Sequence, residues 1–314
     1  MKLLVTGAAG FIGSTFVDFA LSEAELLGIT QVTAIDSFTY AGSLSNLEKA
    51  SGNSRFELVE GDIRDARLIA NLVNASDVVL NFAAESHVDR SIEDPTIFVD
   101  TNVMGTVNIL NAINQTGKRL IQISTDEVYG SIESGSWDED FPLRPNSPYA
   151  ASKASADLLV RSYSQTYGCN TNITRCCNNY GPRQYPEKII PLFVSRLVRG
   201  ETIPVYGDGL NMREWIHVND HVRGILKVLR FGKPGEIYNL GSGFEISNID
   251  LAEKILGILD LPKSRIEFVQ DRPGHDLRYS LDFAKASNEL GFQCLEDFET
   301  SFGDTVSYFA SQFM

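Results

Sequence analysis

The segment Gly7-Ala8-Ala9-Gly10-Phe11-Ile12-Gly13 follows a short apolar run at residues 3–6 and opens a stretch with helical hydrophobic spacing. Glycines spaced G-x-x-G-x-x-G let the backbone turn tightly and approach a pyrophosphate, whose charge then lies at the N-terminus of a helix. Because the segment lies between a strand and a helix near the N-terminus, it predicts a dinucleotide-binding turn. That turn includes Phe11 and Ile12 as well as Gly7, Gly10 and Gly13.

Short apolar runs alternate with helical patterns through the first half of the chain. Several runs are apolar on both faces, as expected of buried parallel strands. Beyond residues 3–6, the expected strands are 31–35, 56–60, 78–82, 120–124 and 172–175. The expected helices are 11–27, 65–73, 95–115 and 148–167. This alternation predicts an α/β fold with a Rossmann-type, doubly wound parallel sheet.

The pattern changes after about residue 175. Asn178-Asn179-Tyr180-Gly181-Pro182 is a loop signal, a helix is expected at 190–199, and Gly- and Pro-punctuated pieces follow. We therefore expect a dinucleotide-binding Rossmann domain over 1–175, to which about 214–240 also return. A smaller, irregular α/β substrate-binding domain is expected over 176–314, at the carboxyl edge of the sheet.

Composition excludes several classes of protein. The 314 residues are 43% hydrophobic and 22% charged, which is ordinary for a globular protein. The 41 acidic and 27 basic side chains give a net charge of −14, which argues against nucleic acid or an anionic membrane surface as a partner. No stretch approaches the ~18 apolar residues that span a bilayer, and the N-terminus leads directly into a strand, so we expect a cytoplasmic protein.

The four cysteines form no C-x-x-C pair. This argues against a zinc site, and no metal is expected. In a cytosolic protein such cysteines are expected to be buried thiols. They are Cys169, Cys176, Cys177 and Cys294.

Residues at the ends of the next strands extend the expected cofactor site. A carboxylate at Asp36, after the second strand, would accept hydrogen bonds from the adenosine ribose and repel a 2′-phosphate, which predicts NAD rather than NADP. Asp62 and Ile63 follow the third strand and are expected to cover the adenine. Ala83 and Ala84 follow the fourth, where small residues let the cofactor pass.

Tyr149 and Lys153 form a Tyr-x-x-x-Lys pattern whose spacing puts both side chains on one face of a helix. A free tyrosine has a pKa near 10 and is a poor base at neutral pH. A nearby ammonium group and the positive charge of the nicotinamide would lower that pKa. With Thr125 at the end of the fifth strand, the pattern predicts a site for oxidising and reducing a hydroxyl, in which Tyr149 and Lys153 also bind the cofactor.

These features together resemble the extended short-chain dehydrogenase/reductase family, and the resemblance covers the whole chain. That family includes epimerases, dehydratases and decarboxylases of nucleotide sugars, so it leaves the reaction open. Asp126 and Glu127, directly after Thr125, narrow the choice. Oxidation and reduction at one carbon need no adjacent carboxyl pair, whereas elimination of water needs one group to remove a proton and another to protonate the departing hydroxyl.

The sequence also resembles the dTDP-glucose 4,6-dehydratases within that family. The matching stretches are 83–91, 124–130, 175–182, 186–188, 206–209 and 272–276. The resemblance implies that Asp126 and Glu127 are the acid/base pair, with Thr125, Tyr149 and Lys153 as the other catalytic residues. Cys177 stands where many members carry Ser, and we assign it no role.

The substrate implied by this resemblance, dTDP-glucose, carries a diphosphate that requires local cations. Lys188, Arg213 and Arg272 lie in the three segments that match the family's nucleotide-binding loops. Arginine suits bidentate contacts with phosphate. The other expected substrate contacts lie in the matching stretches, and they are Ser86, His87, Thr125, Asn179, Glu187, Tyr206 and His275.

Two alternatives share most of these residues. A UDP-hexose 4-epimerase or a UDP-glucuronate decarboxylase would keep Thr125, Tyr149 and Lys153 without needing the two carboxyls. A nucleotide-sensing protein without activity would be free to lose the tyrosine or lysine, yet both are present. A homodimer is expected through the helices at 95–115 and 148–167, because related enzymes pair such helices in a four-helix interface.

Overall fold

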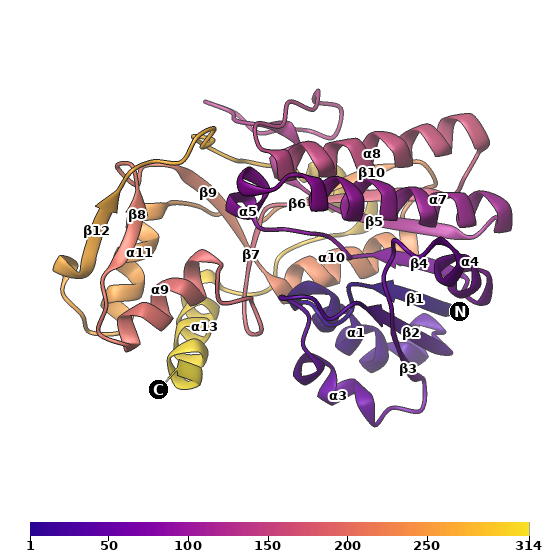
Figure 1. Ribbon diagram of the computed structural model, residues 1–314, viewed down its shortest axis with the longest axis horizontal. Coiled ribbons are helices and arrows are strands. Elements are labelled where there is room, and N and C mark those ends of the chain that lie inside the picture. The colour runs from indigo at the N-terminus through magenta and orange to yellow at the C-terminus, as the bar shows by residue number, and fades with distance from the viewer. Residues whose placement is uncertain (314) are drawn as a thin grey trace.

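The computed structural model describes residues 1–313 and is built around a seven-stranded sheet (Figure 1). Every neighbouring pair in that sheet is parallel, in the order β10-β6-β5-β4-β1-β2-β3. This arrangement confirms the predicted Rossmann-type α/β fold. The strands are β1 (Lys2–Thr6), β2 (Gln31–Asp36), β3 (Phe56–Glu60), β4 (Val78–Asn81), β5 (Arg119–Thr125), β6 (Thr171–Cys176) and β10 (Ile237–Leu240).

Helices cover both faces of this sheet. On one face α1 (Phe11–Ser22) packs against α10 (Val218–Phe231), and their side chains share a core with Leu3 and Val5. On the other face, α4 (Ala66–Ala75) packs on α7 (Gly105–Thr116), which in turn packs on α8 (Pro148–Tyr167). The central strands are buried on both sides, which explains why they read as continuous apolar runs.

Two of the four helices expected in this half are interrupted. The one at 11–27 breaks at Glu23, giving α1 and a short α2 (Ala24–Leu27). The one at 95–115 is split into α6 (Thr96–Phe98), a π-helical turn η2 (Val99–Met104) and α7. The reason for the π turn lies in Asn102, whose buried amide binds the backbone of Glu85 and the hydroxyl of Ser152.

The short connecting elements have these bounds: η1 (Leu44–Leu47), α3 (Glu48–Ser51), α5 (Val88–Glu93), η3 (Asp126–Tyr129), η4 (Lys263–Arg265) and α12 (Ala284–Leu290). The helix α8 begins at the predicted residue because Ser147 caps it, accepting a hydrogen bond from Ala150 N, and Pro148 occupies its first turn.

A second, smaller body holds its own hydrophobic core. It contains a three-stranded sheet, in the order β11-β9-β7, and a two-stranded one. Phe193, Trp215, Leu251 and Phe302 are among the buried side chains between these sheets and three helices. The elements are β7 (Asn178–Tyr180), α9 (Ile189–Val198), β8 (Ile203–Tyr206), β9 (Met212–His217), β11 (Glu245–Ser247), α11 (Asn248–Ile258), β12 (Ile266–Val269) and α13 (Phe298–Phe313).

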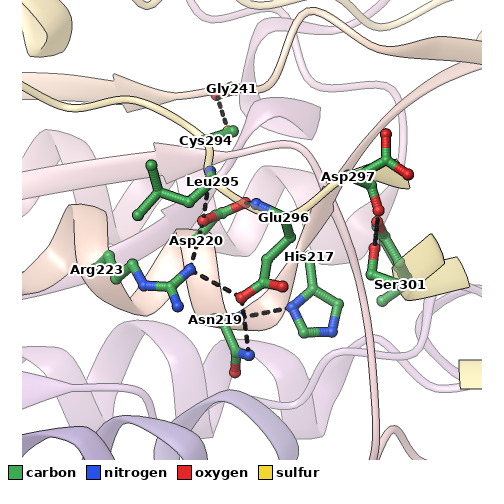
Figure 2. Close-up of polar contacts among 11 residues, drawn as sticks. His217, Asn219, Asp220, Arg223, Gly241, Cys294, Leu295, Glu296, Asp297 and Ser301 are labelled. Atoms are coloured by element: carbon green, nitrogen blue, oxygen red, sulfur yellow. Dashed lines mark hydrogen bonds and ion pairs between the residues drawn. The ribbon is translucent and has the colours of Figure 1, made fainter. Parts of the chain in front are cut away.

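The chain crosses between the two bodies several times. After β9 it returns to the large sheet as α10 and β10, and α12 packs against both of these before α13 packs on α9. Figure 2 shows the contacts that hold the last crossing, between α12 and α13. The Asp220 carboxylate accepts hydrogen bonds from the backbone N–H groups of Leu295 and Glu296. Arg223 bridges Asp220 and Glu296. The residue limits of the two domains stay a prediction.

All four cysteines are free thiols. Three are buried, and Cys294 is partly buried, with its Sγ donating to the Gly241 carbonyl (Figure 2). Over residues 1–313, no helix has both the length and the apolar character needed to cross a membrane.

Candidate active site

One cleft lies at the carboxyl ends of the parallel strands, and it brings together most of the predicted site. All twelve residues expected to hold the cofactor line it: Gly7, Gly10, Phe11, Ile12, Gly13, Asp36, Asp62, Ile63, Ala83, Ala84, Tyr149 and Lys153. Five of the other predicted residues line the same cleft: Ser86, Thr125, Glu127, Asn179 and Lys188.

The glycine turn fits a dinucleotide. Gly7 has a φ of +62°, and a Cβ there would lie 2.6 Å from Ala83 N. A Cβ on Gly13 would lie 2.2 Å from the Gly7 carbonyl oxygen. Gly10 caps α1 without a side-chain hydrogen bond, so the first N–H groups of this 12-residue helix keep their capacity to bind a phosphate.

Asp36 is almost buried at the edge of this turn, with 8% of its surface exposed. Its carboxylate accepts hydrogen bonds from Ala9 N at 2.8 Å and from Phe38 N at 2.9 Å. Burial raises the pKa of Asp36, and the backbone donors oppose that rise. Each carboxylate oxygen has a second lone pair, which leaves Asp36 able to accept from a ribose hydroxyl.

Thr125 connects the carboxyl pair to the end of β5. Its side chain caps the turn η3, accepting a hydrogen bond from Glu127 N at 3.2 Å, and its hydroxyl lies 3.2 Å from Asp126 Oδ1. Tyr149 lies in the first turn of α8 and is held there by a hydrogen bond from its backbone N–H to Ser91 Oγ. The segments that carry Thr125, the carboxyl pair and Tyr149 therefore meet at one edge of the sheet.

The electrostatics of Tyr149 differ from the expectation. Burial raises its pKa well above the ordinary value, and the Glu127, Cys176 and Asp126 side chains add to the rise, against a hydrogen bond to Thr125. Lys153 donates its Nζ to the Ile123 carbonyl at 2.7 Å, and burial lowers its own pKa. Lys153 is not among the main influences on the pKa of the phenol, and the second positive charge that we expected, on the nicotinamide, would favour the phenolate that a tyrosine base requires.

Asp126 and Glu127 occupy different environments. Burial and the neighbouring Glu127 raise the pKa of Asp126 well above its usual range, and only 1% of this residue is exposed. Burial also raises the pKa of Glu127, but Arg272, Lys188 and Arg213 oppose it. Two carboxyls whose surroundings differ in this way are suited to the separate roles of acid and base.

The three predicted cations therefore surround Glu127, although only Lys188 lines the cleft. Lys188 donates to the Ser86 carbonyl at 2.7 Å. Arg213 is buried, donates to the carbonyls of Met212 and Asp276, and lies 4.2 Å over the Tyr279 ring. Arg272 Nη1 lies 3.4 Å from Asp89 Oδ1.

Tyr206 and His275 lie beside Arg272, outside the cleft. The two rings meet edge-to-face at 6.2 Å, and His275 Nδ1 lies 2.7 Å from Asp271 Oδ1. They form a group with Arg272, whose guanidinium is 6.0 Å from the Tyr206 ring.

The remaining predicted contacts are engaged with protein groups. The Glu187 carboxylate binds Arg90 with both oxygens, and His87 Nε2 lies 3.6 Å from it. The Asn179 side chain lines the cleft but also contacts His221 Nδ1 at 2.9 Å. Asp62 forms an ion pair with Arg64 that lowers its pKa.

Sequence reasoning missed several residues of the cleft. Gly61 and Arg64 adjoin predicted residues, and their place after a strand was a usable signal. Gln184 and Tyr185 come from an irregular loop that carries no periodic signal. Tyr185 packs edge-to-face on Tyr40, whose ring lies beneath the Arg90 guanidinium at 4.1 Å.

Comparison with known proteins supports the reading of this cleft. The family model described as GDP-mannose 4,6 dehydratase matches residues 4–305. A dTDP-glucose 4,6-dehydratase from Actinoplanes sp. is 52% identical over 312 residues, covering 98% of each chain. The low-salt glycan biosynthesis protein Agl12 from Haloferax volcanii is 51% identical over 310 residues, again covering 98% of each.

A solved structure agrees with these relatives. DesIV, a dTDP-glucose 4,6-dehydratase from Streptomyces venezuelae crystallised with NAD and TYD bound, has a TM-score of 0.97 and 51% identity, covering 99% of this chain and 97% of that one. Sequence and fold agree, and the resemblance drawn from the motifs is confirmed: the chain belongs to the dTDP-glucose 4,6-dehydratase family.

Proposed function

We propose that this chain converts dTDP-glucose into dTDP-4-keto-6-deoxyglucose and water, as an NAD-dependent hydro-lyase. The observation that carries the proposal is the adjacent Asp126–Glu127 pair, placed beside Tyr149 in the cleft that the dinucleotide turn opens. The relatives of about 50% identity bear the name of this activity. The glycine turn, Asp36 and Lys153 would hold the cofactor.

The first step concerns C4 of the sugar. When bound, NAD supplies oxidising power by taking a hydride from C4 and later returning it to C6, so it is not consumed and stays tightly bound. Tyr149 accepts the proton of the C4 hydroxyl, and Thr125 orients that hydroxyl. Both residues line the cleft, and each is less than 10% exposed.

The second step uses the two carboxyls. A ketone at C4 acidifies the hydrogen on C5, which Glu127 removes because its three neighbouring cations favour the ionised base. Asp126, held protonated by burial, gives its proton to the C6 hydroxyl, which leaves as water. An epimerase or a decarboxylase has no use for such a pair, so the pair favours the dehydratase over both alternatives.

The nucleotide end needs positive charge, since the protein carries −14 overall. We assign Lys188, Arg213 and Arg272 to the diphosphate because all three act on Glu127 and so lie near one another. Tyr206 and His275 extend this group toward the nucleoside, and Ser86, His87 and Asn179 lie toward the sugar. Glu187 acts through Arg90 in this assignment.

The chain would act as a cytoplasmic homodimer. The helices α7 and α8 lie side by side on one face of the molecule (Figure 1). They and the adjoining π turn expose apolar side chains: Val99, Met104 and Leu158. Pairing these helices with a second copy would bury them, and a Leu158→Glu variant should sediment as a monomer in analytical ultracentrifugation.

The deciding experiment omits added cofactor. The purified protein is incubated with dTDP-glucose and, separately, with UDP-glucose, and the products are weighed by mass spectrometry. Loss of one water from dTDP-glucose, faster than from UDP-glucose, is expected. An unchanged mass would reject the dehydratase for these sugars. Chromatography would then separate epimerisation from inactivity, and UDP-glucuronate would test for decarboxylation.

A further inference from the structure

Asp126, Cys177 and Glu214, which we call the row, are buried residues at or near the ends of neighbouring strands. Thr125, next to Asp126, pairs with Cys176, and Trp215, next to Glu214, pairs with Asn178, so Cys177 lies in the chain between the two pairings. Both carboxyls act on the Cys177 thiol, and Glu214 acts on Asp126. The three residues are 1%, 3% and 0% exposed, so solvent screens their interactions weakly.

Glu214 is held by the backbone rather than by a cation. Its Oε1 accepts from Ser242 N at 2.6 Å and Gly243 N at 2.9 Å, and its Oε2 accepts from Leu281 N at 2.7 Å. Among residues 1–313 it makes no ion pair. Burial raises the pKa of Glu214, and the three N–H donors oppose that rise by stabilising the carboxylate. Because both oxygens accept from N–H groups, this bonding suits a carboxylate with no counter-ion of its own.

The other carboxyl in the row is incompletely bonded. Asp126 Oδ1 contacts the Thr125 hydroxyl, whereas Oδ2 is buried and has no hydrogen-bond partner in the described chain. A buried carboxylate oxygen without a donor is costly, but a protonated one aimed at a substrate hydroxyl is not. The bonding of Asp126 therefore favours its neutral form.

The groups that face Asp126 come from four elements. Glu127 follows it in η3, Glu214 and Arg213 come from β9, Cys176 and Cys177 come from the end of β6, and Tyr149 comes from α8. Arg213 and the Thr125 hydroxyl favour the ionised form of Asp126. Burial, Glu127 and Glu214 oppose it. The thiols and the phenol are neutral at pH 7, since burial raises the pKa of each.

We propose that Glu214 is a positioning residue for water elimination: a buried, uncompensated carboxylate that keeps the proton on Asp126 until the C6 hydroxyl leaves. The inference rests on the proposed function. Glu127 also raises the pKa of Asp126, but it cannot fill this role throughout the step, because it takes up the C5 proton while Asp126 gives its own proton away.

The step balances as follows. The C5–H electron pair forms the C5–C6 double bond while the proton goes to Glu127. The O–H bond of Asp126 breaks, its proton joins the C6 oxygen, and the C6–O bond breaks with its electron pair on the departing water. Asp126 is then a carboxylate beside Glu214, and repulsion between the two charges favours its reprotonation. The proton that Tyr149 took from the C4 hydroxyl replaces, through solvent, the proton that Asp126 gave away. The proton on Glu127 passes back to C5 when the hydride is returned to C6.

The test follows the elimination rate against pH. Single-turnover loss of water from dTDP-glucose is timed by quenching and mass spectrometry in wild type, Glu214→Gln and Glu214→Asp, and reduced-cofactor absorbance reports the C4 step separately. Elimination needs protonated Asp126, so its rate falls at high pH. We expect Glu214→Gln to shift this fall in the elimination rate to lower pH by at least one pH unit. At pH values above the fall, the variant should then eliminate water about tenfold more slowly than wild type. Glu214→Asp keeps the negative charge on a side chain that is one methylene shorter, which draws the charge back toward β9. It should shift the pH profile less than Glu214→Gln does.

Other outcomes decide differently. A folded Glu214→Gln protein with the wild-type pH profile, or one that slows both steps equally at every pH, would show that Glu214 only holds the loops at 241–243 and 281. If wild type releases no water from dTDP-glucose, the proposed function fails instead.

An infrared measurement covers the case in which Glu214→Gln does not fold. A carboxylic C=O band that is present in wild type at neutral pH and absent from Asp126→Asn would report the proton on Asp126. We expect wild type to show this band, and we expect the band to titrate at lower pH in Glu214→Asp than in wild type. Its absence from wild type, or an unchanged titration, would overturn the inference.

Discussion

Arg90 and Glu187 join two segments that are 97 residues apart in the chain. The Arg90 guanidinium, on α5, donates to both carboxylate oxygens of Glu187 and lies 4.1 Å over the ring of Tyr40. Lys188, the next residue, faces Glu127. This contact therefore couples the loop after β2, which lines the cleft, to the segment that carries Lys188.

Replacing Arg90 with Ala should weaken substrate binding more than it destabilises the fold. Both partners are partly exposed, so the pair contributes under about 1 kcal/mol to stability. Loss of the ion pair with Glu187 leaves the neighbouring Lys188 less firmly positioned. We therefore expect KM for dTDP-glucose to rise roughly fivefold, which corresponds to about 1 kcal/mol, with a smaller change in kcat. Steady-state kinetics measure both. Lys254→Ala, which breaks the ion pair with Glu299 outside the cleft, should leave KM unchanged.

Gly13→Ala should remove tightly bound cofactor. The added Cβ would lie 2.2 Å from the Gly7 carbonyl oxygen, so the turn that receives the phosphates must open. The measurement is the NAD content of purified protein, released by heat and quantified by chromatography. Gly257→Ala is the control, because that glycine lies in α11 with no atom within 4 Å of its Cβ position. It should keep its NAD and gain up to about 1 kcal/mol. Full NAD occupancy in Gly13→Ala would contradict the assignment of the turn.

Asp126→Asn should separate the two halves of the reaction. The amide keeps the size of the side chain but has no acidic proton, so C4 oxidation continues while water loss slows by about 10²- to 10⁴-fold. A quench-flow experiment would detect the oxidised sugar accumulating. Dehydration at the wild-type rate would remove Asp126 from the role of acid.

His221 should make the fold sensitive to acid. Burial lowers its pKa to about 3, against 6.5 for an ordinary histidine. Between these values the unfolded chain binds a proton that the folded chain does not, so this contribution to stability is complete above pH 6.5 and is lost as pH falls. The loss amounts to up to about 1.4 kcal/mol for each pH unit. His87, His217 and His275 act in the same direction through smaller shifts.

Urea unfolding of wild type and His221→Gln at pH 7, 6 and 5 checks this sensitivity. The variant should be less stable at pH 7 yet lose less stability between pH 6 and 5. Asn179→Ala breaks the same hydrogen bond without removing the imidazole, so it should keep the wild-type slope. Parallel curves for wild type and His221→Gln would refute the prediction.

Much of the large domain could be read from the sequence because its signals are local. Buried parallel strands are apolar on both faces, so β4 lies within one residue of its predicted limits. Helix α8, which has a serine cap and a proline in its first turn, has the predicted bounds. The edge strand β3 also has the predicted bounds, although it is partly exposed. The π turn at 99–104 could not be foreseen, because it depends on Asn102 reaching Glu85 and Ser152, which lie far along the chain.

The cofactor residues were readable for the same reason: each follows a strand whose end must lie at one edge of the sheet. Electrostatics were not readable in this way. The pKa of Tyr149 depends on burial and on carboxyls that reach it only in the folded chain. Glu214 carries no motif of its own, and its importance emerges from the register that sets Cys177 beside it.

The repeated crossings between the two bodies limit how this enzyme can be dissected. A protein cut after residue 175 would lack β10, leaving β6 as an unpaired sheet edge, and would lack α10, exposing the apolar side of α1. The fragment after residue 175 would contain β9 and α9, but its chain would no longer be continuous with the cleft loops of the large domain. We therefore expect that neither half can be produced alone as a folded protein. Exchange of domains among relatives should succeed only when several segments are transplanted together.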